Sequence, residues 1–214
     1  KIDAGLDTPD YYQVLNEMIE AGYEGTELGD WGFMPTDPAK LKDELQAHGL
    51  ELISAFVPVR FRDRNFWEKG LSAALRTATL LSVVSGGTSV VVLSDEIGSN
   101  FVRTQNAGRI IPEMGLLPIQ WKTFTDGVEY VSKRVFEEIG LKSVFHHHCA
   151  GFVETSGEIG MFLDYADPQW VNLCLDTGHF RFAGGDPQRI FKNFSDRVKL
   201  VYFKDCSPQV ADQS

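Results

Sequence analysis

The stretches Val-Phe-His-His-His at residues 144–148 and Leu-Cys-Leu-Asp-Thr-Gly-His at residues 173–179 decide how this chain is interpreted. Each is a run of residues that favour β-strands, and each ends in side chains that bind metals or transfer protons. When two neighbouring parallel strands end in such side chains, a metal site is expected at that edge of the sheet. The rest of the chain is interpreted as the scaffold of this site.

The composition limits the classes of protein to which the chain can belong. Its 214 residues, 43% of them hydrophobic, are enough for one domain with a substantial core. The net charge of -10 gives a surface that repels phosphate backbones, so nucleic acid is not expected as a partner. No apolar run is long enough to cross a bilayer, so no membrane association is expected either. The three cysteines form no CxxC pair, which favours a reducing cytoplasm over a disulfide framework.

Strand and helix patterns alternate along the chain. Strands are predicted over residues 25–29, 50–57, 89–95, 142–148, 171–176 and 198–204. Helices are predicted to start at Thr8-Pro9 and Asp37-Pro38, and to cover about 66–81, 121–139, 158–165 and 186–194. The polar, glycine-bearing segment 96–118 is predicted to be a long loop or a lid.

This alternation predicts a parallel sheet made of βαβ units. An open doubly wound sheet would accommodate six strands, but no glycine-rich dinucleotide fingerprint follows any of them. A (β/α)8 TIM barrel that lacks its first and last strands in this sequence fits better. We therefore expect residues 1–214 to form a single TIM-barrel domain that is truncated, or incompletely given, at both ends.

Histidines and an aspartate at two strand ends are the candidate metal ligands. His146 and His148 lie two residues apart on a predicted strand, so their side chains point the same way and His147 points the other way. Asp176 ends the next strand. A carboxylate and one or two imidazoles form a partial shell for Mn²⁺, Zn²⁺, Co²⁺ or Fe²⁺, whereas core histidines would instead be satisfied by backbone carbonyls. We assign His148 and Asp176 to the metal and His146 to the substrate.

Three further side chains are candidates for catalysis. His179 can act as an acid, a base or a ligand, because imidazole titrates near neutral pH, or it can be a loop or N-cap histidine. Glu154 can be a general base or an oxygen ligand, or a solvated loop carboxylate. Lys204 ends the last predicted strand and can stabilise an enolate oxygen, or pair with Asp205 or Asp176.

Two residues near the first predicted strand are candidates for substrate binding. Glu27 lies between Gly25 and Gly29, which leave room for a ligand to approach. A charged residue in a short buried strand also needs a partner. Trp31 can line a sugar-sized pocket together with Phe33 and Trp121, although aromatic residues are more often part of a core.

Several short motifs are shared with one superfamily. They are Glu-Leu-Gly at 27–29, His-x-His at 146–148, Leu-Asp-Thr-Gly-His at 175–179, Gly-Gly-Asp-Pro at 184–187 and Lys-Asp at 204–205. From about Tyr11 to Cys206 the chain resembles the xylose isomerase-like TIM-barrel superfamily of sugar isomerases, epimerases and endonuclease-IV-like proteins. Within this superfamily it is most similar to inosose dehydratase-like proteins.

The resemblance implies a divalent metal ion (Mn, Co, Zn or Mg) at the C-terminal mouth of the barrel. It implies that the ion holds the oxygens of a sugar or cyclic polyol ketone while a proton next to the carbonyl is removed. Loss of a hydroxyl group would make the enzyme a lyase, and return of the proton elsewhere would make it an isomerase or epimerase. By analogy Asp176 is a metal ligand, and His179 and Lys204 contact substrate. The family usually has a metal-binding histidine where this chain has Tyr202.

The sequence thus favours a cytoplasmic, metal-dependent lyase or isomerase with a small-molecule sugar or polyol substrate, and leaves open whether it forms a homo-oligomer. Tyr202 favours a second hypothesis, a non-catalytic or repurposed sugar-binding barrel. A third hypothesis, an endonuclease-IV-like DNA repair enzyme, is disfavoured by the acidic composition.

Overall fold

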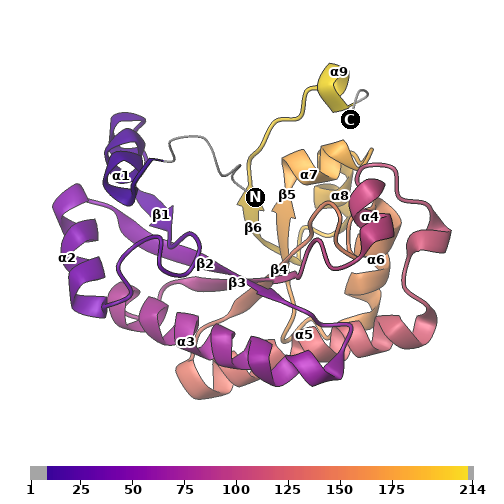
Figure 1. The fold of residues 1–214 in the computed structure, drawn as a ribbon, viewed down its shortest axis with the longest axis horizontal. Coiled ribbons are helices and arrows are strands. Elements are labelled where there is room, and N and C mark those ends of the chain that lie inside the picture. The colour runs from indigo at the N-terminus through magenta and orange to yellow at the C-terminus, as the bar shows by residue number, and fades with distance from the viewer. Residues whose placement is uncertain (1–8, 212–214) are drawn as a thin grey trace.

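The computed structural model describes residues 9–211 and shows a curved sheet with helices along its outer side (Figure 1). The strands are β1 (Gly25–Glu27), β2 (Glu51–Val59), β3 (Val90–Asp95), β4 (Ser143–His146), β5 (Leu173–Asp176) and β6 (Val198–Tyr202). All neighbouring strands are parallel, and their order in the sheet follows their order in the chain. This confirms the predicted six-stranded parallel sheet.

Helices connect the strands. They are α1 (Tyr11–Glu20), α2 (Pro38–His48), α3 (Trp67–Ser85), α4 (Phe101–Gln105), α5 (Pro118–Ile139), α6 (Ser156–Tyr165), α7 (Thr177–Phe182), α8 (Pro187–Asn193) and α9 (Pro208–Ala211), with short 3₁₀ helices η1 (Arg64–Phe66) and η2 (Pro112–Met114). No helix between residues 9 and 211 has the length and apolar character needed to span a membrane.

Capping residues explain where the helices near the N-terminus begin. Asp37 caps α2 by accepting a hydrogen bond from the Lys40 N–H at 2.9 Å, as the Asp-Pro pair predicted. The predicted start of the first helix is wrong, because the cap is Asp10, which accepts from the Gln13 N–H at 2.8 Å. Thr8 lies outside the described residues.

Two connections contain helices that the sequence did not predict. The segment 96–118, expected to be a loop, includes α4, which Asn100 caps by accepting from the Arg103 N–H at 3.0 Å. Helix α7 starts directly after β5, where a turn was expected. The side chain of Asp176 caps it, so the same residue ends a strand and begins a helix.

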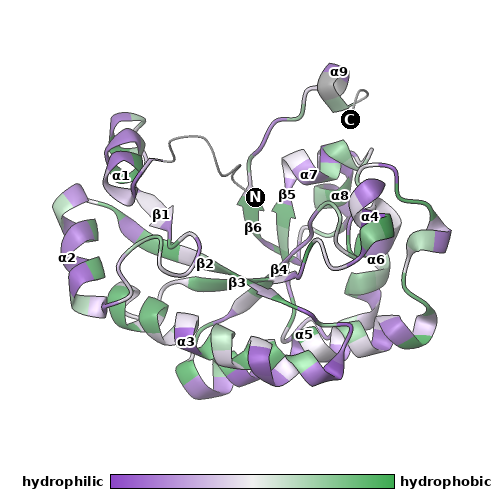
Figure 2. Ribbon diagram, viewed as in Figure 1, coloured by the Kyte–Doolittle hydropathy of each residue, from purple (hydrophilic) through white to green (hydrophobic). Residues whose placement is uncertain are grey.

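The two faces of the sheet carry different side chains. Alternate residues such as Leu93, Phe145 and Leu175 pack against the helices in the main core. The residues between them, Val92 and Cys174 among others, form a separate small cluster on the inner face of the curved sheet. Figure 2 shows hydrophobic residues along much of the strands, whereas the helices carry hydrophobic and hydrophilic residues side by side. Side chains that continue the inner face to the strand ends build the site described next.

Candidate metal and substrate site

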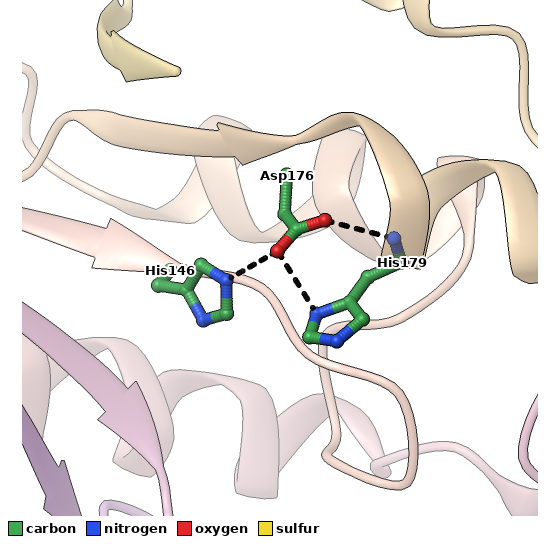
Figure 3. A group of neighbouring side chains, drawn as sticks. All are labelled: His146, Asp176 and His179. Atoms are coloured by element: carbon green, nitrogen blue, oxygen red, sulfur yellow. Dashed lines mark hydrogen bonds and ion pairs between the residues drawn. The ribbon is translucent and has the colours of Figure 1, made fainter. Parts of the chain in front are cut away.

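Asp176 is fully buried and is the centre of a polar cluster. Its Oδ1 accepts the backbone N–H of His179 at 2.8 Å. Its Oδ2 lies 3.1 Å from Nε2 of His146, 3.3 Å from Nδ1 of His179 and 2.6 Å from Nζ of Lys204. Figure 3 shows that His146, from the end of β4, and His179, from α7, both point toward this carboxylate. Three nitrogens from three elements therefore converge on one oxygen.

These residues fit a divalent metal ion. His146, Asp176 and His179 each offer one ligand atom, and the three atoms lie within 4.8 Å of one another. Nδ1 of His179 is buried and makes no well-directed hydrogen bond among the described residues, although Oδ2 of Asp176 lies 3.3 Å away. A buried nitrogen without a partner is costly, and coordination of a metal ion would satisfy it. Two imidazoles and one carboxylate are ligands that Zn²⁺, Mn²⁺ and Co²⁺ accept.

The protonation states of the cluster also suit a metal ion. Burial alone would raise the pKa of Asp176, but hydrogen bonds from His146 and Lys204 hold that pKa well below its usual range. Burial, followed by the neighbouring His148, lowers the pKa of His179 to about 4. Near neutral pH the carboxylate is therefore charged and the His179 imidazole is neutral, which are the forms that bind metals.

The structure groups His146 with Asp176, where the sequence analysis had assigned His148 to the metal and His146 to the substrate. Strand β4 ends at His146, and a turn follows in which Ala150 has a positive φ of 67°. The alternation of a strand therefore does not continue to His148. Its Nδ1–H donates to the Cys149 carbonyl at 2.7 Å, and its ring centroid lies 4.0 Å from that of His179. His148 is a neighbour of the group, and its role as a ligand stays a prediction.

His147 packs beside His146, with the two rings nearly parallel and their centroids 5.9 Å apart, so the expected opposite orientation of the two side chains is not confirmed. Its Nε2 accepts the backbone N–H of Asp176 at 3.0 Å, and its ring contacts Phe180. Burial lowers the pKa of His147 to about 3, so the ring stays neutral and can accept this hydrogen bond. The sequence analysis assigned no role to this side chain.

Lys204 follows β6 and pairs with Asp176, one of the two partners considered for it. The Thr177 hydroxyl donates to the Lys204 carbonyl at 2.7 Å and accepts from the Lys204 N–H at 2.9 Å. A Cβ atom at Gly178 would lie 2.6 Å from Cβ of Lys204, so only glycine allows this close approach. The four successive residues of the Asp-Thr-Gly-His motif thus have separate roles: two are candidate metal ligands, the threonine hydroxyl fixes the backbone of Lys204, and the glycine permits the close approach.

Glu27 is partly buried in β1 and has the partners that a charged residue there needs. Its Oε1 accepts hydrogen bonds from the hydroxyl of Tyr202, at 2.5 Å, and from the hydroxyl of Ser54. Burial, followed by the charge of Glu27, raises the pKa of Tyr202, so the phenol keeps its proton and acts as a donor. The Tyr202 ring lies 5.1 Å from that of His146. The hydroxyl of Tyr202 therefore uses its only proton in the hydrogen bond to Glu27.

Two of the predicted site residues are held elsewhere. Glu154 is buried, and its two oxygens accept the backbone N–H groups of Gly108, at 2.6 Å, and Ala150, at 2.7 Å. The ring of Trp31 lies under the guanidinium of Arg76, at 4.1 Å. No interaction found among the described residues joins Glu154 or Trp31 to the carboxylate of Asp176. Glu154 anchors two loops, and the catalytic and binding roles of the pair stay predictions.

A buried ion pair that the sequence analysis missed holds the segment before α5. Arg103 of α4 is fully buried and donates to both oxygens of Glu158, at 2.7 and 3.0 Å, and to the Met114 carbonyl. Glu158 in turn accepts the N–H groups of Glu154 and Thr155. The two partners are 55 residues apart, and no sequence spacing indicates such a pair.

The chain belongs to the family of xylose isomerase-like TIM barrels, because the sequence model of this family matches residues 15–214. Among curated proteins, it is 32% identical over 200 residues to the inosose dehydratase of Geobacillus kaustophilus, covering 94% of this chain and 63% of that protein. It is 31% identical over 203 residues to the inosose dehydratase of Lacticaseibacillus casei, covering 95% of this chain and 66% of that protein. The chain thus spans slightly less than two thirds of the length of these relatives.

Solved structures share the fold. The 3-keto-D-glucoside 4-epimerase YcjR from E. coli aligns with a TM-score of 0.70 and 16% identity, covering 92% of this chain and 75% of that one. The probable 3-DHS dehydratase AsbF from Bacillus anthracis aligns with a TM-score of 0.69 and 15% identity, covering 96% and 70%. A zinc-bound IOLI protein aligns with a TM-score of 0.65 and 16% identity, covering 89% and 66%. These likenesses confirm the predicted barrel class.

Proposed function

We propose that this chain is part of a divalent-metal-dependent lyase or isomerase that acts on a sugar or cyclic polyol ketone by removing the proton next to the carbonyl. One observation carries the proposal: His146, His179 and Lys204 converge on a single buried oxygen of Asp176. Relatives named inosose dehydratase support a ketone substrate of this kind and favour loss of water as the reaction. The three free cysteines support a reducing, cytoplasmic environment.

His146, Asp176 and His179 would hold the metal ion. When bound, a divalent ion polarises a substrate carbonyl and makes the adjacent proton more acidic. The chain prepares the site by keeping the Asp176 carboxylate charged and the His179 imidazole neutral near pH 7, as the shifts in their pKa values indicate. The backbone hydrogen bond from His179 fixes Oδ1 of Asp176, which leaves Oδ2 for the ion.

Three further side chains would act on the substrate. The Nδ1–H of His148 donates to a backbone carbonyl, so its Nε2 carries the lone pair and can accept the proton. Burial lowers the pKa of His148 and favours this neutral form. The half-exposed ammonium of Lys204 can stabilise negative charge on the carbonyl oxygen. Glu27, held by Tyr202 and Ser54, can accept hydrogen bonds from substrate hydroxyl groups.

Proton exchange tests the proposal without assuming a lyase or an isomerase. The full chain is incubated with inosose in D₂O, with and without Mn²⁺ or Co²⁺, and mass spectrometry follows deuterium uptake and loss of water. We expect metal-dependent uptake at the carbon next to the carbonyl, with Asp176→Asn reducing it to the background rate. Uptake that a chelator does not lower, or that Asp176→Asn retains, would contradict the proposal.

A non-catalytic sugar-binding barrel is the second candidate, favoured by the Tyr202 hydroxyl being committed to Glu27. Under this alternative the parent chain binds no divalent ion, and Tyr202→His creates an affinity for Mn²⁺ or Zn²⁺ that the parent lacks. Isothermal titration of both proteins with each metal separates the two candidates, because the first requires binding by the parent.

A further inference from the structure

The ammonium group of Lys204 contacts the carboxylate oxygen that the candidate ligand atoms of His146 and His179 also face. Its Nζ is 2.6 Å from Oδ2 of Asp176, the same oxygen that lies 3.1 Å from His146 and 3.3 Å from His179. The other oxygen, Oδ1, already accepts the His179 N–H, so Oδ2 is the oxygen that both cations would share. We propose that Lys204 is an internal competitor for the metal ion, which must displace this ammonium from Asp176 in order to bind.

Electrostatics make the two occupants mutually exclusive. An ammonium and a divalent ion that share one carboxylate oxygen would lie only a few ångströms apart in a partly buried setting and repel each other. Asp176 is fully buried, so water screens this repulsion little. One carboxylate oxygen can therefore be neutralised by Lys204 or by the metal ion, but not by both.

The structure also lets Lys204 leave without unfolding the site. Half of its side chain (49%) is exposed, whereas Asp176 has no exposure. Its backbone is fixed on both sides by the Thr177 hydroxyl, so the strand end stays in place while the flexible side chain moves. The centroid of the Tyr202 ring already lies 5.4 Å from Nζ, so the ammonium can keep this cation–π contact when it leaves Asp176.

This inference rests on the proposed function and adds a step to it. Without metal, Lys204 compensates the buried charge of Asp176, so the site does not leave an unpaired carboxylate. With metal, the released ammonium becomes available to a substrate oxygen. Metal binding and the freeing of Lys204 are thus a single event.

Metal affinity provides the first test. The full chain, Lys204→Met and Lys199→Met are titrated with Mn²⁺ and with Zn²⁺ in a calorimeter. Because a charge-assisted hydrogen bond must be broken in the parent but not in Lys204→Met, we expect this variant to bind about tenfold more tightly. Lys199→Met removes the same charge from an exposed position on β6 and should bind like the parent.

Amine labelling of the parent chain provides the second test and needs no variant to fold. Acetylation of Lys204, with Lys199 as the internal reference, is measured by mass spectrometry with and without saturating Mn²⁺. We expect the labelling of Lys204 to increase several-fold when the metal binds, while the labelling of Lys199 is unchanged.

The outcomes separate this inference from the proposed function. If the parent binds metal as tightly as Lys204→Met does, or if Lys204 labelling is unchanged when metal is bound, the competition is refuted while the metal-dependent function stands. If neither the parent nor Lys204→Met binds metal, the proposed function fails and the inference fails with it. Binding by both proteins, with Lys204→Met about tenfold tighter, supports the competition. Binding by Lys204→Met alone would contradict the proposed function, and the inference with it.

Discussion

Asp95, the last residue of β3, is a buried carboxylate with only part of its hydrogen-bonding capacity used. It is 4% exposed, and its Oδ2 accepts the Phe152 N–H at 3.3 Å. Its Oδ1 has no partner in the described part of the chain. Burial raises the pKa of Asp95 from 3.8 to about 7, because the charged form loses its hydration. The folded protein therefore carries a free-energy penalty at Asp95 that grows as the pH rises.

The sign of this dependence follows from which state binds the proton. Between pH 4 and pH 7 folded Asp95 is protonated whereas unfolded Asp95 is not, so its contribution to stability falls as pH rises through this range. Asp95→Asn removes the charge and should raise the free energy of unfolding at pH 8 by about 1–3 kcal/mol, with a smaller gain near pH 4. Urea unfolding at pH 4.5, 6 and 8 measures this. Asp43→Asn, at an exposed position of α2, is the control, and a gain for Asp95→Asn that does not vary with pH would contradict the argument.

At the scale of elements, the Arg103–Glu158 pair joins α4 to the start of α6. Breaking such a pair leaves a buried charge without a partner, so Arg103→Met should lower the free energy of unfolding by about 3 kcal/mol. The double variant Arg103→Met, Glu158→Gln should recover part of this loss, because the glutamine oxygen still accepts the backbone N–H groups. Urea unfolding measures both, and hydrogen exchange should show faster opening of residues 101–116.

A surface pair gives the matched control. Arg134 and Glu138 lie four residues apart on α5, and their side chains are 39% and 40% exposed. Arg134→Met should lower the free energy of unfolding by less than about 1 kcal/mol, because water screens an exposed ion pair. Equal losses for Arg103→Met and Arg134→Met would show that the buried pair does not hold the segment.

The elements also show how far sequence reasoning extends. The ends of β3 and β5 and the Asp-Pro caps of α2 and α8 were predicted, because they depend on neighbours within a few residues. In contrast, β1, β4 and β6 each end two residues before the predicted end. Helix α7 was missed because Asp176 was treated only as a ligand, although its side chain also accepts the His179 N–H that begins the helix. The grouping of His146 rather than His148 with Asp176 depends on the turn at Ala150, and a non-glycine residue with positive φ gives little signal in a sequence.

At the scale of the whole molecule, one hydrogen bond connects the two edge strands of the described sheet. Tyr202 of β6 reaches Glu27 of β1, which no strand pairing joins to it. The sequence indicated that Glu27 needed a partner, but not which one, because the partner is 175 residues away. Fold class could thus be predicted from local patterns, whereas the pairings within the site depend on how the sheet curves.

Removing this bond tests its contribution. Tyr202→Phe should lower the free energy of unfolding by about 1–3 kcal/mol, because Glu27 loses a donor in a partly buried setting. Tyr130→Phe is the matched control, because the Tyr130 hydroxyl donates to Glu68 at 2.6 Å in an exposed phenol–carboxylate pair between α3 and α5. In the same urea titration, Tyr130→Phe should lower the free energy of unfolding clearly less than Tyr202→Phe does. If the two variants lower the free energy of unfolding by similar amounts, the hydrogen bond between β1 and β6 contributes no more than an exposed one.

The order of the strands bears on how the chain acquires its structure. Because each strand pairs with the one synthesised just before it, a nascent chain can extend the sheet unit by unit as it leaves the ribosome. The contact between Tyr202 and Glu27 is different, since it cannot form until β6 has been made. The environment of this phenol is therefore a marker of the last stage of folding, and its ultraviolet absorbance should change later than any signal from β1 to β3.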